Sequence, residues 1–150
     1  MGTLSQYLIF RCGPARYAIE LGRVLQVIEE QELEMVPGAP SHCLGVVSHY
    51  GRLISVFEGQ PILGGETGLG PEEGTLASNR GFPVWLVMKS EEYSVAVRVD
   101  GVESIATIGN EWSVPEEAKD GLVDALWRNE SGVVNRIDPH GLLQRIDSLF

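Results

Sequence analysis

Tyr7-Leu8-Ile9-Phe10-Arg11-Cys12-Gly13-Pro14-Ala15-Arg16-Tyr17-Ala18-Ile19-Glu20 is the stretch of sequence that decides the fold. Two short runs rich in aromatic and β-branched residues lie on either side of Gly13-Pro14. Such runs favour extended backbone, and Gly-Pro favours a turn because Gly tolerates positive φ and Pro presets its own φ. The pattern predicts a β-hairpin with strands over Tyr7–Arg11 and Arg16–Glu20.

The same pattern recurs in the second half of the chain. Leu8-Ile9-Phe10 and Tyr17-Ala18-Ile19 are echoed by Leu86-Val87-Met88 and Tyr93-Ser94-Val95, at offsets of 78 and 76 residues. The hairpin-like segment from Val46 to Phe57 is repeated in the same way by the segment from Asp124 to Ile137. Because a repeat at a fixed spacing indicates two copies of one structural unit, we expect two related β units.

Five short strands bury one face best by curling into a small barrel, which also removes exposed edges. We therefore predict an all-β fold of two five-stranded barrels side by side, within a single domain over residues 1–150. The first barrel unit covers about 7–57 and the second about 83–137, joined by a Gly-rich connection over about 58–82. Neighbouring strands are expected to pair antiparallel.

Further strands are predicted where β-branched or aromatic residues run between Gly, Pro or Asn. They cover Leu33–Val36, Leu44–His49, Arg52–Phe57, Val84–Lys89, Ser94–Val99, Ser104–Ile108, Gly121–Trp127 and Gly132–Ile137. A short helix is expected over Gly22–Glu29, after the second strand. A C-terminal helix is expected over about 139–148, with Asp138 as its N-cap and Pro139 at its first position.

Charge and composition narrow the class of protein. The 150 residues include 11 Lys and Arg against 21 Asp and Glu, a formal net charge of −10, and 43% are hydrophobic. A chain of this length builds a core without disulfides, so we interpret Cys12 and Cys43 as reduced. Basic residues are scattered singly, which argues against nucleic acid and anionic membranes as ligands. No apolar run approaches the roughly 20 residues of a membrane span, and the start lacks a basic leader, so we expect a cytoplasmic protein without membrane insertion.

Soft metal ligands gather only at His42, Cys43 and His49. Three groups are fewer than the four that structural zinc prefers, so no metal is predicted. No nucleophile elbow and no phosphate-binding loop occurs, so we predict neither a catalytic residue nor a cofactor. A thiol-dependent enzyme that uses Cys43 with His42 or His49 is the alternative from another functional class.

Two other features allow both a structural and an interaction role. Glu29, Glu30, Glu32 and Glu34 form a dense acidic segment, which is either a solvated rim or a field that steers a basic partner. Trp112 either covers one end of a barrel or contributes to an interface, where indole rings are over-represented. Glu29, Glu30 and Trp112 are therefore candidate partner-facing residues.

Several short motifs together carry a family resemblance: Tyr7-Leu8-Ile9-Phe10, Tyr17-Ala18-Ile19, Val24 to Ile28, Val36-Pro37-Gly38-Ala39-Pro40, Gly45-Val46-Val47, Gly51, Leu53-Ile54, Val99-Asp100-Gly101-Val102 and Leu142-Leu143. With these residues in this order, the chain resembles the CheW-like chemotaxis coupling proteins. The resemblance implies two five-stranded SH3-like barrels with a groove between them, and no catalytic activity. It also implies two partners, because family members bridge a methyl-accepting receptor to the regulatory domain of the CheA histidine kinase.

The resemblance further implies which residues meet partners. The receptor-facing residues it implies are Val24, Gln26, Gly45 and Tyr50; His49 and Arg52, beside Tyr50, are further candidate partner-facing residues. The family usually has an acidic residue at Gln26 and Arg at Tyr50. Exchanging that Arg for Tyr removes a charged fork of five donors and leaves an aromatic face and a hydroxyl. The alternative function is therefore a CheW-fold protein that binds or sequesters another signalling protein without bridging receptor and kinase.

Overall fold

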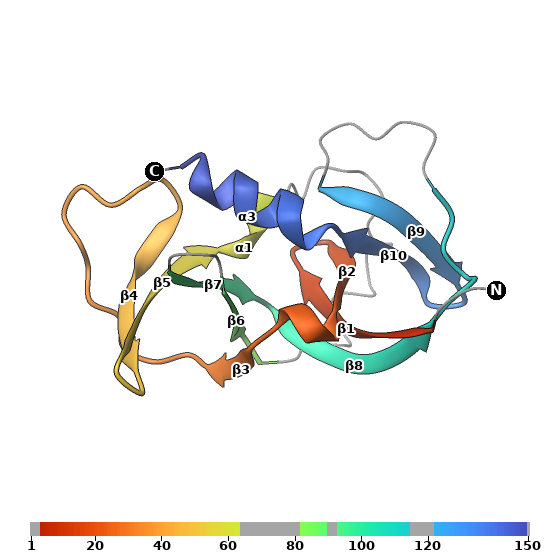
Figure 1. Ribbon diagram of the computed structural model, residues 1–150, viewed down its shortest axis with the longest axis horizontal. Coiled ribbons are helices and arrows are strands. Elements are labelled where there is room, and N and C mark those ends of the chain that lie inside the picture. The colour runs from red at the N-terminus through yellow and green to blue at the C-terminus, as the bar shows by residue number, and fades with distance from the viewer. Residues whose placement is uncertain (1–3, 64–81, 90–92, 115–121, 150) are drawn as a thin grey trace.

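A computed structural model describes residues 4–63, 82–89, 93–114 and 122–149. They form two five-stranded sheets, which lie side by side (Figure 1). The strands are β1 (Ser5–Cys12), β2 (Ala15–Glu20), β3 (Gln26–Glu29), β4 (Cys43–His49), β5 (Arg52–Glu58), β6 (Val84–Lys89), β7 (Ser94–Val99), β8 (Gly101–Ile108), β9 (Val123–Asn129) and β10 (Gly132–Ile137). The helices are the 3₁₀ helix η1 (Leu21–Arg23), α1 (Gly59–Leu63) and α3 (Pro139–Asp147).

The predicted all-β class is confirmed, and the two predicted five-stranded barrels are present as two five-stranded sheets. The first sheet has the strand order β8-β1-β2-β10-β9, and the second has the order β3-β6-β7-β5-β4. In the described part of the chain, the two edge strands of each sheet are not paired with each other. The predicted C-terminal helix is also confirmed: the Asp138 side chain accepts a hydrogen bond from the His140 N–H at 3.2 Å, and Pro139 occupies the first turn.

The internal repeat is present in the structure. Ile9 pairs with Ala18 in the β1–β2 hairpin, and Val87 pairs with Ala96 in the β6–β7 hairpin, each residue 78 positions after its counterpart. The β4–β5 hairpin corresponds in the same way to β9–β10, and each is followed by a helix. These two helices, α1 and α3, are joined by a hydrogen bond of 2.9 Å from the Arg145 guanidinium to the Ile62 carbonyl.

The two repeats exchange strands, which corrects the prediction of separate units over 7–57 and 83–137. The first sheet joins β1 and β2 to β8, β9 and β10, whereas the second joins β6 and β7 to β3, β4 and β5. The exchange begins at η1, which turns the chain away from β2. The Leu25 N–H then donates to the Val87 carbonyl at 2.8 Å, so β3 continues along β6 and not along β1. The exchange also makes two pairs parallel, β2 with β10 and β5 with β7, where the sequence predicts antiparallel neighbours.

The short helix predicted after the second strand is present as η1, but its predicted extent and the strand predicted after it differ from the structure. The predicted helix over Gly22–Glu29 is helical only at η1, and its second half is β3, in which Ile28 points inward beside the buried Trp85. The predicted strand over Leu33–Val36 is a single bridge at Glu34.

The predicted connection over 58–82 begins with a helix. Glu58 is the last residue of β5, and α1 follows it, with Ile62 and Leu63 buried in the core. Residues 64–81 lie outside the described part of the chain. The predicted strand Gly121–Trp127 corresponds to β9, which runs over Val123–Asn129, and position 121 also lies outside the described residues.

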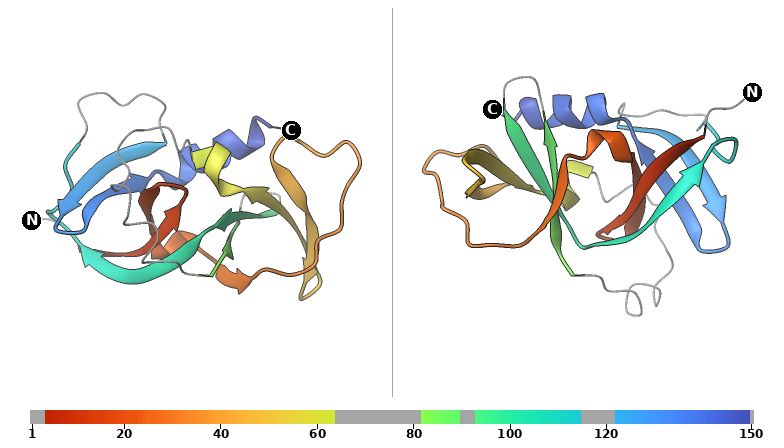
Figure 2. Two further views of the ribbon diagram at one scale, coloured as in Figure 1. Left: turned by 180° about the vertical axis from the view of Figure 1, so that it is seen from behind. Right: turned by 60° about the horizontal axis from the view of Figure 1, so that its bottom comes forward.

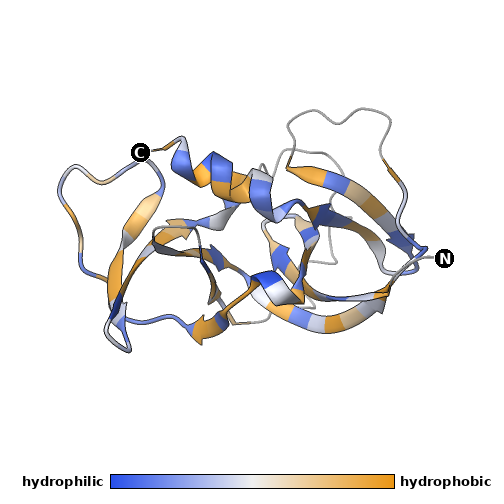
Figure 3. Ribbon diagram, viewed as in Figure 1, coloured by the Kyte–Doolittle hydropathy of each residue, from blue (hydrophilic) through white to orange (hydrophobic). Residues whose placement is uncertain are grey.

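Three apolar clusters hold the sheets together. The central cluster lies between the sheets and under α3, and it includes Phe10, Tyr17, Leu86 and Leu142. A smaller cluster fills the inner face of each sheet, one around Ile9 and the other around residues such as Trp85 and Val87. Both faces of β1, β2, β6 and β7 are therefore buried, which explains why these strands read as nearly continuous apolar runs (Figure 3).

Among the described residues, none of the helices has both the length and the apolar character needed to cross a membrane.

Candidate interaction surface

The β4–β5 hairpin ends in an exposed and strained tip. Tyr50 and Gly51 both have positive φ, 51° and 78°, as in a two-residue type I′ turn. Positive φ is uncommon for residues other than Gly, Asn and Asp, and it costs about 1 kcal/mol or more. Burial offsets none of this cost, because Tyr50 is 89% exposed. An aromatic ring held in solvent on a strained backbone is typical of a residue that contacts another molecule.

His49 and Arg52 form the base of this tip. They are register partners across β4 and β5. The His49 ring lies edge-on to the Tyr50 ring, with centroids 4.4 Å apart and planes at 73°. The structure therefore brings three of the predicted candidates together, at the end of the molecule away from the N-terminus and β9 (Figures 1 and 2).

An exposed apolar side chain extends the tip along β5. Leu53 is 67% exposed, whereas its neighbour Ile54 is 2% exposed. Because side chains alternate across a strand, an inward Ile54 leaves Leu53 on the outer face, three residues from Tyr50. Sequence reasoning missed Leu53, although the alternation over Leu53-Ile54-Ser55-Val56 could have identified it.

A segment that precedes β4 returns along the outer edge of that strand. The Glu34 N–H donates to the Val46 carbonyl, and the Val46 N–H donates to the Glu34 carbonyl, both at 2.9 Å. Met35 and Val36 follow directly and are 78% and 43% exposed. No pattern in the sequence distinguishes Met35 as exposed. We call the exposed apolar side chains of this region the β4–β5 surface: Met35, Val36, Tyr50 and Leu53.

Gly45 lies beneath this returning segment. Its φ is +144°, and a Cβ there would lie 2.7 Å from the Glu34 carbonyl oxygen and 3.1 Å from the Leu33 Cβ. The ladder between β4 and β5 shifts register at this position. Gly45 is buried and has no Cβ, so the backbone of β4 can approach the backbone at Glu34. This close approach explains why the position is occupied by glycine.

Val24 and Gln26 lie at the opposite edge of the same sheet. Val24 is half-buried at the end of η1, where its N–H donates to the Leu21 carbonyl at 3.2 Å, and it contacts the central core. Gln26 is exposed and begins β3. The structure therefore places Gln26 and Gly45 in the two opposite edge strands of one sheet, with Val24 just before β3 and Tyr50 in the turn after β4.

The acidic segment is tied to the second sheet through one arginine. The Arg98 guanidinium lies 3.0 Å from the Glu30 carboxylate and 3.4 Å from the Glu58 carboxylate. Partial burial acts to lower the pKa of Arg98, but the two carboxylates outweigh it and raise that pKa. Glu29 is exposed at the end of β3. Two carboxylates around one guanidinium give this cluster a net negative charge.

Trp112 lies on the other sheet and is occupied by contacts within the chain. Its ring meets Tyr7 edge-on at 5.1 Å and Trp127 edge-on at 6.4 Å between centroids. The Arg136 guanidinium carbon lies 5.0 Å from the centre of the Trp112 ring. Trp112 is half-buried in this cluster and far from the β4–β5 surface, so its geometry favours covering one end of the first sheet.

Cys43 is poorly placed to act together with His49, and the thiol of Cys12 is buried. Cys43 begins β4 and His49 ends it, and the six residue-to-residue steps of extended strand between them span about 20 Å. The Cys43 Sγ instead lies 3.7 Å from the Gly45 carbonyl. Burial, reinforced by Asp100 and Glu58, raises the pKa of Cys12 to about 12, so its reactive thiolate is scarce at neutral pH. Neither cysteine forms a disulfide, and within the described ranges no three His, Cys, Asp or Glu side chains are grouped to hold a metal ion.

Comparisons with known proteins agree with this architecture. The family model of the CheW-like domain matches residues 6–147. Among solved structures, the scaffolding protein TtCheW from Thermoanaerobacter tengcongensis is similar in fold, with a TM-score of 0.73 and 15% sequence identity. The similarity covers 93% of this chain and 92% of that chain. No curated protein matches the chain in sequence.

Proposed function

The chain belongs to the CheW-like family, a family of chemotaxis coupling and scaffold proteins, and on this premise we propose that it couples a methyl-accepting receptor to a CheA-type histidine kinase by protein–protein contact. The proposal assigns it no catalytic step. A rigid pair of sheets transmits a signal between two partners only through differential binding of their states, which requires exposed contact surfaces and not a reactive group.

The single observation that carries the proposal is the tip of the β4–β5 hairpin. Tyr50 is 89% exposed at positive φ, and Leu53 adds a second exposed apolar side chain beside it. Exposed apolar side chains that gather in one region mark interaction sites on soluble proteins, and Tyr is enriched among the residues that dominate binding energy. We propose that the β4–β5 surface meets the receptor, with Tyr50 as the central contact.

The same tip favours a second candidate. The family usually has an arginine at the position of Tyr50. A partner that normally contacts this arginine would lose charge-assisted hydrogen bonds when it meets Tyr50. A signalling protein with an apolar groove would fit the tip better than an acidic one. In that case the chain binds or sequesters such a protein without bridging receptor and kinase.

Co-purification distinguishes the two candidates. The full chain is mixed with a receptor cytoplasmic tip, with the kinase regulatory domain, and with both. A complex of all three supports coupling. The second candidate is supported, and the first contradicted, if the chain captures neither the receptor tip nor the kinase domain but binds a different chemosensory protein saturably.

A substitution at the tip tests the receptor contact directly. Tyr50→Arg restores the family's usual residue, and we expect it to tighten binding to a conventional receptor tip by about tenfold, the effect of one charge-assisted hydrogen bond. Titration calorimetry measures the affinity. Phe82→Arg is the matched control, because Phe82 is an equally exposed aromatic residue outside the β4–β5 surface, at 87%. Equal affinity of Tyr50→Arg and the unsubstituted chain would count against this surface as the receptor site.

A further inference from the structure

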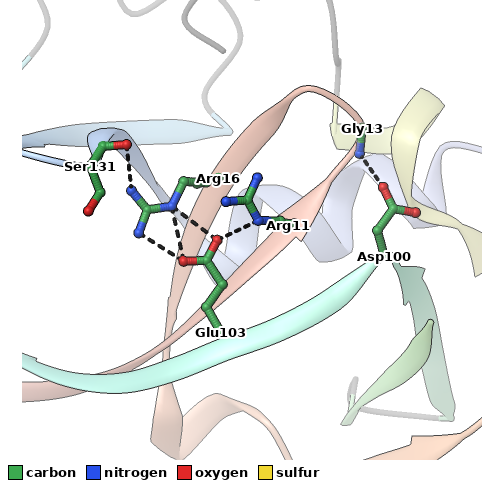
Figure 4. A network of polar contacts seen from close by, with 6 residues as sticks. All are labelled: Arg11, Gly13, Arg16, Asp100, Glu103 and Ser131. Carbon is green, nitrogen blue, oxygen red and sulfur yellow. Dashed lines mark hydrogen bonds and ion pairs between the residues drawn. The ribbon is translucent and has the colours of Figure 1, made fainter. Parts of the chain in front are cut away.

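Arg11 and Arg16 share one carboxylate on the first sheet, next to the β1–β2 turn (Figure 4). The Arg16 Nη2 donates to Glu103 Oε1 at 2.9 Å, and the Arg16 Nε donates to Oε2 at 3.1 Å. The Arg11 Nε lies 2.7 Å from Glu103 Oε2, an ion pair without the alignment of a hydrogen bond. The Arg16 Nη1 donates to the Ser131 carbonyl at a long 3.3 Å.

The strand register explains why the two arginines meet. Arg11 of β1 and Arg16 of β2 are direct cross-strand partners, so their side chains leave the same face of the first sheet. Ile9 and Ala18, two positions further along these strands, belong to the inner cluster of that sheet. The two guanidiniums therefore lie at one end of the inner face, next to an apolar interior.

The cluster holds a surplus of positive charge in a place that shields it from water. Among the described residues, two guanidiniums face one carboxylate, and the side chains of Arg11 and Arg16 are only 7% and 10% exposed. Arg98 shows the opposite balance, with the carboxylates of Glu30 and Glu58 around one guanidinium. In a chain with a formal net charge of −10, a buried positive surplus stands out from its surroundings.

Two nitrogens of Arg11 lack a hydrogen-bond acceptor in the described part of the chain: Nε, which only forms the ion pair with Glu103, and Nη1. The Arg11 Nη1 is buried, and no hydrogen-bond partner for it is found in the structure described above. A buried charged donor without an acceptor is destabilising, and most such groups in native proteins are satisfied by a protein atom, a water molecule or an ion. We propose that this cluster is a binding site for a small oxyanion, a phosphate or carboxylate group, with the Arg11 Nη1 as its first donor.

The chemistry of the donors selects this class of ligand. A guanidinium is a planar fork of N–H donors with no acceptor, which matches the oxygen atoms of phosphate and carboxylate groups and repels cations. Glu103 is the most exposed of the three side chains at 21%, so an anion would reach the guanidiniums from the side of Glu103. The site lies on the first sheet, so its occupancy is separate from docking at the β4–β5 surface and does not rest on the proposed coupling function.

Binding of inorganic phosphate and of acetate tests the proposal. Each anion is titrated against the full chain at constant ionic strength, with chloride as the balancing anion, by calorimetry and by the midpoint of thermal unfolding. We expect saturable heat and a rise of the midpoint with at least one of the two anions. Saturation with phosphate alone assigns a phosphate group, and saturation with both assigns any oxyanion of this size, including an acidic side chain or chain terminus.

Two substitutions separate this site from general charge screening. Arg11→Met keeps the Arg16–Glu103 pair and removes the unpaired donor, so we expect anion affinity to fall by at least about tenfold. Arg98→Met removes the same charge from a guanidinium already surrounded by two carboxylates, and we expect anion affinity to stay unchanged. If Arg11→Met does not fold, Arg11→Lys takes its place, because it keeps the charge and removes the planar fork. Absence of saturation with both anions, or equal loss in the Arg11 and Arg98 variants, overturns the proposal.

Discussion

Replacing Tyr50 with asparagine is expected to stabilise the protein and to weaken its binding. The tip has positive φ at Tyr50 and at Gly51, and Asn-Gly is the preferred pair for such a turn. Relief of the left-handed conformation contributes about 1 kcal/mol. The substitution also removes the edge-on contact with His49, which at an exposed position contributes about 0.5 kcal/mol. Burial adds nothing, because Tyr50 is 89% exposed.

The net effect is a gain of about 0.5 kcal/mol in the free energy of unfolding, or roughly 1–2 °C in Tm for a chain of this length. Binding changes in the opposite direction. Loss of a central aromatic contact costs about 2 kcal/mol, which is roughly 30-fold in Kd. Urea denaturation measures the stability, and titration calorimetry with the co-purified partner measures the affinity.

Tyr50→Phe is the matched control, because it keeps both the ring and the strained backbone. We expect its stability and its affinity to stay close to those of the unsubstituted chain. A Tyr50→Asn variant that is less stable would refute the strain argument. A variant that is more stable but binds equally well would show that the ring is not a contact residue.

Other substitutions test the packing of the second sheet and the buried thiol. Gly45→Ala is expected to lower the free energy of unfolding by about 2 kcal/mol or more in urea denaturation, because its Cβ would lie 2.7 Å from the Glu34 carbonyl oxygen at φ +144°; an unchanged midpoint would contradict that contact. Leu53→Ser should change stability by less than about 0.5 kcal/mol at an exposed position, yet weaken partner binding in calorimetry, and equal affinity would remove Leu53 from the surface. Burial raises the pKa of Cys12 from 9.0 to about 12, so the unfolded chain loses this proton first. Stability should therefore fall as pH rises from 9 toward 12, by up to about 1.4 kcal/mol per pH unit, and Cys12→Ala should remove this part of the slope; identical alkaline unfolding curves would contradict it.

The candidate surface was predictable only in part. The tip at Tyr50, with His49 and Arg52 at its base, follows from two adjacent strands with Tyr50-Gly51 between them. The strain at Tyr50 does not follow, because the φ of a turn residue depends on how the two strands twist. The exposure of Met35 could not be predicted either, because it depends on the pairing of its neighbour Glu34 with Val46 at the outer edge of β4.

Taken alone, the sequence determined the local elements: the hairpins around Gly13-Pro14 and Tyr50-Gly51, the C-terminal helix begun by Asp138-Pro139, and the repeat of the two halves. Alternation, turn chemistry and capping act within a few residues, so they can be read directly from neighbours along the chain.

Only the tertiary structure decided which strands pair. β3 follows β2 by a few residues but joins β6, and Glu103 meets Arg16 although 87 positions separate them. The two repeats have similar sequences, so β1 and β6 offer nearly the same apolar faces and the same free edge. The sequence of β3 therefore does not indicate which of these two edges it joins. The path of the chain through η1 brings β3 to the β6 edge, and that same exchange brings Arg11, Arg16 and Glu103 together.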